Sequence, residues 1–185
     1  VAFIMLLSYP AYHWYSTQPV KIARLEPDNK IINKSLHVNN QKVITLIEAK
    51  GKTLAPTYAE VVCTDYVINV LHEFYLLTKA EKRAIQIITS EDLKTLIAQD
   101  APIIKGVYTA LIDSGKGVPV ERDSVQAGDF VQFWNVMPTG CYGHCGVVKS
   151  IDDQTLTLYS SHPMTNGFGI HTFRFPDKAY FVRLK

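Results

Sequence analysis

The sequence predicts an α+β domain in which helices from the first part of the chain pack on an antiparallel sheet formed by the last part. Two observations carry this prediction. Segments with apolar residues at helical spacing precede residue 115, and short segments rich in β-branched and aromatic residues follow it, separated by Gly, Asp, Asn and Pro. Helices followed by consecutive strands are typical of a sheet with a helical layer against it.

The composition agrees with one folded domain and argues against several classes of partner. Of the 185 residues, 47% are hydrophobic and 19% are charged, which excludes a disordered or fibrous chain. Lys and Arg number 19 and Asp and Glu 17, so the net charge of +2 gives no basic signature for nucleic acid. No uninterrupted apolar run approaches the roughly 18 to 20 residues that a membrane span requires.

The N-terminal segment, residues 1–20, begins with the apolar run VAFIMLL. It has two interpretations: the end of a signal peptide or of a membrane anchor upstream of residue 1, or a first core strand. The first interpretation predicts an extracytoplasmic or cell-envelope location. Residues 21–185 are predicted to form a single domain, because no repeat, low-complexity segment or long linker divides them.

The helices are predicted in order from residue 43. An apolar stripe at 43–47 is followed by Gly51 and Pro56, which mark the end of the first helix. The strongest pattern begins at Thr57, which forms a capping box with Glu60, and runs to residue 77. Its apolar face carries Cys63, Val67, Val70, Leu71 and Phe74. This start places Cys63 in the second turn of the helix.

Two further helices are predicted after the strongest one. They are Ser90–Gln99, capped by Ser90, and Ile103–Ser114. Pro102 separates them, because a proline disfavours the helical conformation of the residue before it.

Five strands are predicted in the last third of the chain, at 130–134, 146–151, 155–160, 170–175 and 179–184. Asp152 and Asp153 form the turn of a hairpin between the second and third of them.

The hairpin turn sets a register and a facing for the residues of these two strands. A turn centred between residues 153 and 154 places Cys145 opposite His162 and Val147 opposite Ser160. Ser160 and His162 are in phase with the apolar Leu156 and Leu158. We therefore expect Ser160 and His162 to point to the side where the helices lie.

The three cysteines, at positions 63, 141 and 145, are too few and too oddly numbered for a disulfide framework. A free thiol becomes a useful nucleophile when a neighbouring base favours the thiolate. Cys63 is the candidate nucleophile. His144, in the glycine-rich segment TGCYGHCGVV directly before a strand, is the candidate base.

A catalytic histidine needs a third polar group that holds its ring. Ser160, Ser161 and His162, at the end of the neighbouring strand, are the candidates. His162 is preferred because it can donate or accept a hydrogen bond at neutral pH.

A different class of function uses the same segment. Cys141, His144, Cys145 and His162 are ligand types that could hold a tetrahedral zinc ion. Without that site, no cofactor is predicted.

Three aromatic residues are candidates for the substrate cleft. Tyr142 precedes His144 on the glycine-rich loop and could overhang the cleft, whereas Tyr66 and Trp134 lie on a predicted helix and strand. Packing in the core is the other role open to each of them. The hydroxyl of Tyr58 or of Tyr66 could also donate to a reaction intermediate.

Three segments, VCTDYVINV, AGDFVQFW and GHCGVVKSIDDQTLTLYSSHP, occur in this order between roughly residues 57 and 163. In this respect the chain resembles the CHAP domains, the cysteine, histidine-dependent amidohydrolases and peptidases that are related to NlpC-type cell-wall peptidases. The resemblance implies a papain-like fold, with Cys63 as nucleophile and His144 as base. The family usually has Glu or Asn near the end of the following strand, where this chain has Ser160 and His162.

The resemblance also implies a function. It is hydrolysis of an amide bond through an acyl-enzyme on Cys63, commonly in peptidoglycan peptides. Relatives that have lost the residue orienting the histidine can instead act as binding modules. A side chain within hydrogen-bond distance of the outer nitrogen of His144 would discriminate the two.

Overall fold

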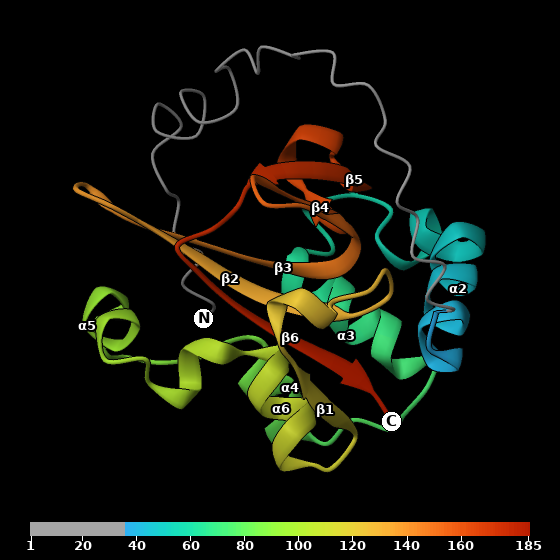
Figure 1. The fold of residues 1–185 in the computed structure, drawn as a ribbon, viewed down its shortest axis with the longest axis horizontal. Coiled ribbons are helices and arrows are strands. Elements are labelled where there is room, and N and C mark those ends of the chain that lie inside the picture. The colour runs from blue at the N-terminus through green and yellow to red at the C-terminus, as the bar shows by residue number, and fades with distance from the viewer. Residues whose placement is uncertain (1–35) are drawn as a thin grey trace. The chain divides into compact units, whose positions relative to one another are not determined.

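A six-stranded antiparallel sheet with helices packed on it is the framework of residues 36–185, the part of the chain that the computed structural model describes (Figure 1). The strand order is β1-β6-β2-β3-β4-β5. The predicted α+β class is therefore confirmed, with one strand more than predicted. Residues 36–185 form one compact unit, and the predictions for the apolar segment 1–20 lie outside the described residues.

The predicted helices and strands occur in the predicted order with altered boundaries, and helix α4 and strand β1 are present in addition. The α-helices are α2 (Val38–Leu54), α3 (Cys63–His72), α4 (Lys79–Ile85), α5 (Leu93–Ala98) and α6 (Val107–Asp113). The strands are β1 (Gly117–Val120), β2 (Phe130–Met137), β3 (Gly140–Ile151), β4 (Thr155–His162), β5 (Gly167–Arg174) and β6 (Lys178–Leu184). Short 3₁₀ turns are η1 (Pro102–Lys105), η2 (Arg122–Ser124) and η3 (Pro163–Thr165). None of the helices in the described range is long and apolar enough to cross a membrane.

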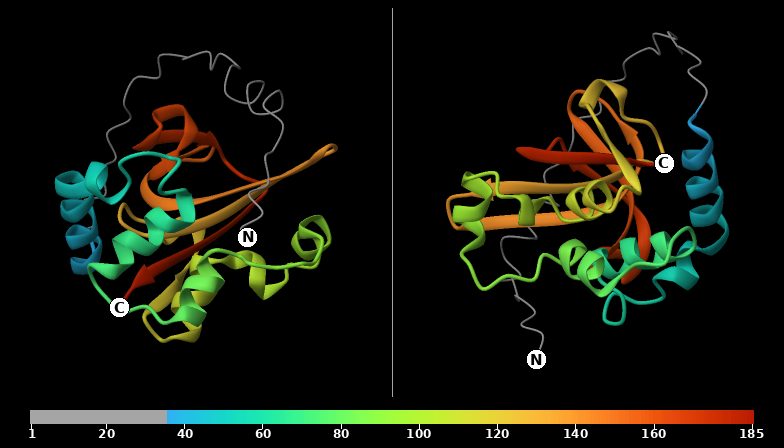
Figure 2. Two further views of the ribbon diagram at one scale, coloured as in Figure 1. Left: turned by 180° about the vertical axis from the view of Figure 1, so that it is seen from behind. Right: turned by 90° about the horizontal axis from the view of Figure 1, so that it is seen from below.

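The two faces of the sheet carry separate apolar clusters. On one face, α3 packs on β3 and β4, and α6 packs on β1, β2 and β6 (Figure 2). We call the cluster between these helices and the sheet the helix-side core; its strand residues include Phe130, Cys145, Val147, Tyr159 and Val182. The opposite face carries the far-side core, which consists of Val131, Phe133, Val148, Leu156, Leu158 and Phe181.

The start of α3 differs from the predicted start. Thr57 and Glu60 do interact, because the Thr57 hydroxyl donates to the Glu60 carboxylate at 3.0 Å, but they hold only a single turn. Val62 is extended, with φ −76° and ψ 176°, so this turn cannot continue into α3. The helix begins at Cys63, and the prediction that Cys63 lies in a second turn is wrong.

The other helices also differ at their boundaries. The cap of α5 is Asp92, whose carboxylate accepts from the Thr95 N–H at 2.8 Å, rather than Ser90. The predicted helix 103–114 is divided at Gly106, whose φ of +51° is a left-handed conformation that favours glycine. Helix α4, capped by the Thr78 and Glu81 capping box, was not predicted.

Candidate functional site

Cys63 is the first residue of α3 and is half-buried. Its side chain therefore lies at the positive end of the helix, where the first N–H groups have no acceptor within the helix. A cysteine in this position is favoured as the thiolate. The N-cap residue of α3, Val62, makes no side-chain hydrogen bond to these N–H groups.

The register between β3 and β4 decides what surrounds Cys63. Near the turn it is the predicted one, with Ser150 opposite Thr157. A bulge between Val148 and Ser150 then shifts it by one residue, so that Val147 lies opposite Tyr159 rather than Ser160. The predicted pairing of Cys145 with His162 is wrong for the same reason.

Beyond this point the two strands follow different neighbours. The pairing of β3 with β4 ends at Val147 and Tyr159, whereas β3 continues along β2 to Gly140 and β4 continues along β5 to His162. The start of α3 packs where β3 and β4 separate, because α3 contacts both strands. This arrangement brings Cys63 to two successive residues of β3, His144 and Cys145.

The electrostatic environment of Cys63 comes from these two neighbours. A hydrogen bond from the Cys145 thiol is the largest cause that lowers the pKa of Cys63, and the charge and hydrogen bond of His144 lower it further against the opposing effect of burial. The same thiol–thiol hydrogen bond, together with burial, raises the pKa of Cys145 well above its ordinary value. The geometry therefore favours a thiolate on Cys63 and a neutral thiol on Cys145.

His144 lies in an aromatic enclosure on the far side of the sheet. Its ring is buried and lies near Phe133, Phe173 and Tyr142, with ring centroids at 5.8, 5.3 and 6.1 Å. Its Nε2 atom is buried and has no hydrogen-bond partner within residues 36–185. The ring is thus held by packing, and its outer nitrogen lacks the polar group that the sequence predicts.

His162 lies beside His144 but does not hold it by a hydrogen bond to Nε2. The two ring centroids are 5.3 Å apart and the rings are perpendicular, at 89°. Nδ1 of His162 accepts from the Met164 N–H at 3.3 Å, and Nε2 lies 3.5 Å from the Tyr142 hydroxyl. The His162 ring also lies beside His171, with centroids 4.3 Å apart.

The two serine candidates point to opposite sides of the sheet. Ser160 is in phase with Leu158, which lies in the far-side core, and its buried hydroxyl has no partner among the described residues. The prediction that Ser160 and His162 point toward the helices is therefore wrong. Ser161 faces the helices instead, and its hydroxyl donates to the Val61 carbonyl, which fixes the backbone just before Cys63.

Of the predicted cleft residues, only Tyr142 remains a candidate. Tyr66 is 0% exposed, and Trp134 is 5% exposed with its indole N–H donating to the Ile104 carbonyl at 2.7 Å. The prediction that these two residues line an open cleft is wrong, because both are core residues. Tyr142 is half-buried and stacks on His144 with an interplanar angle of 16°.

Tyr58 is the more informative tyrosine of the site. It lies in the turn before α3 and is half-buried. Burial and the nearby Cys63 and Cys145 thiols raise the pKa of Tyr58 to about 12, so its hydroxyl stays protonated beside the candidate nucleophile. The sequence suggested Tyr58 or Tyr66 as a hydroxyl donor; Tyr58 lies near both thiols, whereas Tyr66 is buried in the core.

The zinc alternative is wrong, because its four ligands do not meet. Cys141 packs in the cluster of Trp134, whereas Cys145 belongs to the helix-side core, so these two cysteines lie in different clusters. No group of three or more His, Cys, Asp or Glu side chains in the described part of the chain could hold a metal ion.

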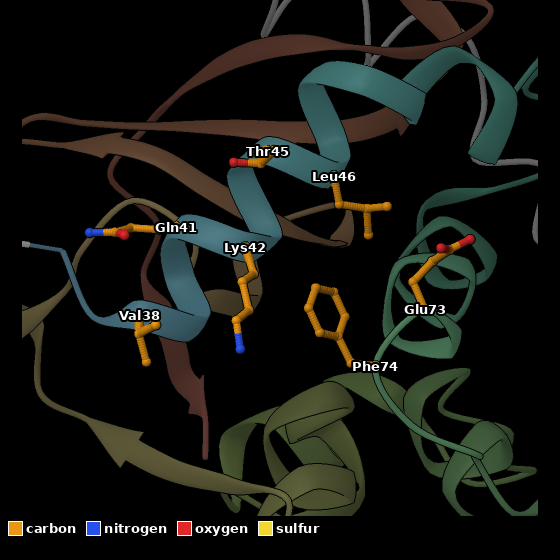
Figure 3. Close-up of a pocket in the computed structure, with 7 residues that line it drawn as sticks. All are labelled: Val38, Gln41, Lys42, Thr45, Leu46, Glu73 and Phe74. Atoms are coloured by element: carbon orange, nitrogen blue, oxygen red, sulfur yellow. The ribbon is translucent and has the colours of Figure 1, made fainter.

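A shallow surface pocket lies apart from these residues. It is formed by α2 and the segment after α3 and is lined by Val38, Gln41, Lys42, Thr45, Leu46, Glu73 and Phe74 (Figure 3). Its residues include no cysteine and no histidine. We therefore assign the candidate site to the start of α3 and not to this pocket.

The two buried histidines predict a specific dependence of stability on pH. Burial, with the charge of a neighbouring histidine, lowers the pKa of His162 to about 3 and that of His171 to about 4, from an ordinary 6.5. The unfolded chain therefore binds protons at these positions below about pH 6.5, while the folded protein does not until the pH is much lower. We expect the free energy of unfolding to fall as the pH decreases from 6.5 toward 4.

Urea unfolding followed by circular dichroism at several pH values measures this effect. The double variant His162→Phe, His171→Phe should show a flatter dependence over the same range, whereas a variant of the exposed His37 should keep that of the wild type. If the free energy of unfolding of the double variant fell with decreasing pH as much as that of the wild type, groups other than His162 and His171 would cause the effect.

Comparisons with protein-family models, with curated proteins and with solved structures found no match for this chain. The function proposed below therefore depends on the surroundings of Cys63 and His144 and on the resemblance of the three sequence segments.

Proposed function

We propose that the chain is a papain-like cysteine hydrolase of the CHAP type that cleaves an amide bond through an acyl-enzyme on Cys63. The observation that carries the proposal is the contact of Cys63, the first residue of α3, with His144 on β3. A thiol at a helix N-terminus beside an imidazole is the arrangement that activates a cysteine nucleophile.

Each step of the proposed reaction has a candidate group in this chain. The Cys63 thiolate attacks the carbonyl carbon of the amide, and the proton of the thiol resides on His144. The oxyanion receives hydrogen bonds from the N–H groups of the first turn of α3, including that of Cys63 itself, and from the hydroxyl of Tyr58.

The second half of the proposed reaction releases the products. His144 gives its proton to the departing amine, which leaves an acyl group on Cys63. A water molecule, deprotonated by His144, then hydrolyses this thioester and restores the thiol. Transfer of the acyl group to an amine would use the same intermediate and differ only in the attacking group.

The proposed substrate is a peptide amide of peptidoglycan, which accords with an extracytoplasmic or cell-envelope location. The support for this substrate class is the resemblance of three segments of this chain to CHAP and NlpC-type domains. Two of these segments contain Cys63 and His144. The segment GDFVQFW contains Asp129, which is buried and forms an ion pair with Arg183. This segment therefore has a structural role in the domain.

A catalytically silent binding module is the second candidate, and one observation favours it. The outer nitrogen of His144 is buried and has no hydrogen-bond partner among residues 36–185. An imidazole without such a partner has no fixed tautomer, which weakens its action as a base.

Cleavage of purified peptidoglycan by the reduced protein tests the proposed function. We expect new free amino groups in the digest, and we expect an acyl adduct on Cys63 by mass spectrometry after rapid acid quenching. Binding to the sacculi with neither cleavage nor adduct would overturn the hydrolase proposal in favour of the binding module.

Alkylation by iodoacetamide checks the reactivity of the thiol without a substrate. At neutral pH we expect Cys63 to react faster than Cys141 and Cys145, because Cys63 is partly exposed and its pKa is lowered. The pKa of Cys145 is raised by its interaction with Cys63 and by burial, and the pKa of Cys141 is raised by burial. Peptide mapping after timed quenching gives the three rates separately. If Cys63 in the folded protein reacts no faster than Cys141, it is an inert core thiol.

A further inference from the structure

Cys145 is a buried nucleophile that the proposed mechanism does not use. It is 1% exposed and belongs to the apolar cluster against which Cys63 packs, and its thiol interacts with the thiol of Cys63. The two residues are far apart in the chain, and only the packing of α3 on β3 brings them together.

The positions of Cys63 and Cys145 are fixed by the packing of the core and by a hydrogen bond to the backbone. Cys145 belongs to the helix-side core, and Cys63 packs against that core at its edge. The Ser161 hydroxyl holds the Val61 carbonyl and so fixes the backbone before Cys63. Cys141, the third cysteine, belongs to a different cluster around Trp134.

We propose that Cys145 is a resolving cysteine for Cys63, so that hydroperoxides convert the pair into a reversible disulfide that blocks the nucleophile. The inference rests on the proposed function for one premise, which is that Cys63 is a reactive, partly exposed thiolate. It does not require that the chain cleave any amide.

The chemistry proceeds in two balanced steps. In the first, the Cys63 thiolate attacks one oxygen of hydrogen peroxide; an S–O bond forms, the O–O bond breaks, and the departing hydroxide takes the proton that the Cys63 thiol gave to His144 and leaves as water. In the second, the Cys145 sulfur attacks the Cys63 sulfur; an S–S bond forms, the S–O bond breaks, and hydroxide leaves with the proton of the Cys145 thiol as a second water. The two thiols are oxidised by two electrons, and the peroxide is reduced.

The surroundings of Cys145 favour the second step once the first has occurred. The hydrogen bond to the Cys63 thiolate and the charge of that thiolate are two of the causes that raise the pKa of Cys145. A neutral sulfenic acid on Cys63 removes the charge, so Cys145 loses its proton more easily at the moment when its attack is needed.

The test exposes the reduced protein to hydrogen peroxide and records intact mass and peptide maps. We expect the wild type to lose about 2 Da, to give a Cys63–Cys145 cross-linked peptide, and to regain its mass and its iodoacetamide reactivity with dithiothreitol. The matched control Cys141→Ser should behave as the wild type, and Cys63→Ser should form no disulfide.

Removal of the resolving thiol provides the decisive comparison. In Cys145→Ser we expect a sulfenic acid on Cys63 that dimedone traps, and conversion to higher oxides about tenfold faster than in the wild type. Cys145→Ala, checked by circular dichroism, guards against an effect of a hydroxyl in the core. Accumulation of sulfenic or sulfinic acid in the wild type without a disulfide, or a disulfide to Cys141, would overturn the proposal.

The outcomes separate this inference from the proposed function. Rapid alkylation of Cys63 without a peroxide-induced disulfide would overturn the resolving role and leave the hydrolase intact. A Cys63–Cys145 disulfide in a protein that binds peptidoglycan without cleaving it would support the resolving role and overturn the hydrolase.

Discussion

Replacement of Cys63 by Ala is expected to lower kcat/KM for amide cleavage by about 10,000-fold or more, because it removes the group that we propose forms the acyl-enzyme. His144→Ala should lower it by about 100- to 10,000-fold, the range of a general base. The double variant should be no slower than Cys63→Ala, since the two residues act as one unit. Release of amino groups from peptidoglycan under subsaturating conditions measures all three.

The matched control for these variants is Cys141→Ala, which removes a thiol outside the site. Its kcat/KM should stay within about twofold of the wild type, as for a substitution that touches no catalytic group. If Cys63→Ala retained the wild-type rate, the acyl-enzyme mechanism would be disproved.

Replacement of Asp129 by Ala is expected to destabilise the folded protein by about 3–5 kcal/mol. The reason is that the Arg183 guanidinium and the other donors to the buried Asp129 carboxylate lose their acceptor. The Asp129 carboxylate is 0% exposed. It accepts from the Arg183 guanidinium through two nitrogens, at 2.7 and 2.8 Å, and from the Asn40 amide and the Gln126 N–H, each at 2.8 Å. These bonds join α2 and β6 to the loop that leads into β2.

Urea unfolding at neutral pH measures this loss. Asp123→Ala is the matched control, because Asp123 is an exposed carboxylate in η2, and its effect should stay within about 0.5 kcal/mol. A loss of stability in Asp129→Ala no larger than in the control would contradict the structural role of the network.

The fold class could be predicted because the periodicity of apolar residues changes along the chain. The five predicted strands all lie within strands of the structure or overlap them. Strand β1 was missed because its sequence, GVPV, is short and contains a proline. Helix α4 was missed although its capping residues, Thr78 and Glu81, are visible in the sequence.

Only those features of the candidate site that depend on residue type and nearby sequence could be predicted. Cys63 and His144 were singled out from residue type and sequence context, and the packing of α3 on β3 brings them together. The first residue of α3 could not be predicted, because it depends on the extended Val62 and on the bond from Ser161. The bulge before Ser150 carries no glycine or turn signal, so its change of register was equally hidden.

Three neighbours of the site were not anticipated for the same reason. Cys145 was considered only as a zinc ligand, His171 received no role, and Tyr58 was one of two candidates. Each of them meets the site through tertiary contacts: Cys145 at the start of α3, His171 on the ring of His162, and Tyr58 beside both thiols. The adjacency of Cys145 to His144 in the sequence is the one signal that could have indicated its position.

The central claim is that Cys63 is a thiolate activated by its neighbours at the start of α3. The measurement that tests it most directly is a titration of thiolate ultraviolet absorbance in the reduced protein, taken as the difference between wild type and Cys63→Ser. We expect the Cys63 thiolate to persist well below the range near 8.5, roughly that of a free cysteine, and to need a higher pH in His144→Ala. A Cys63 thiol that titrates at or above the free-cysteine range, with no effect of His144→Ala, would contradict the account.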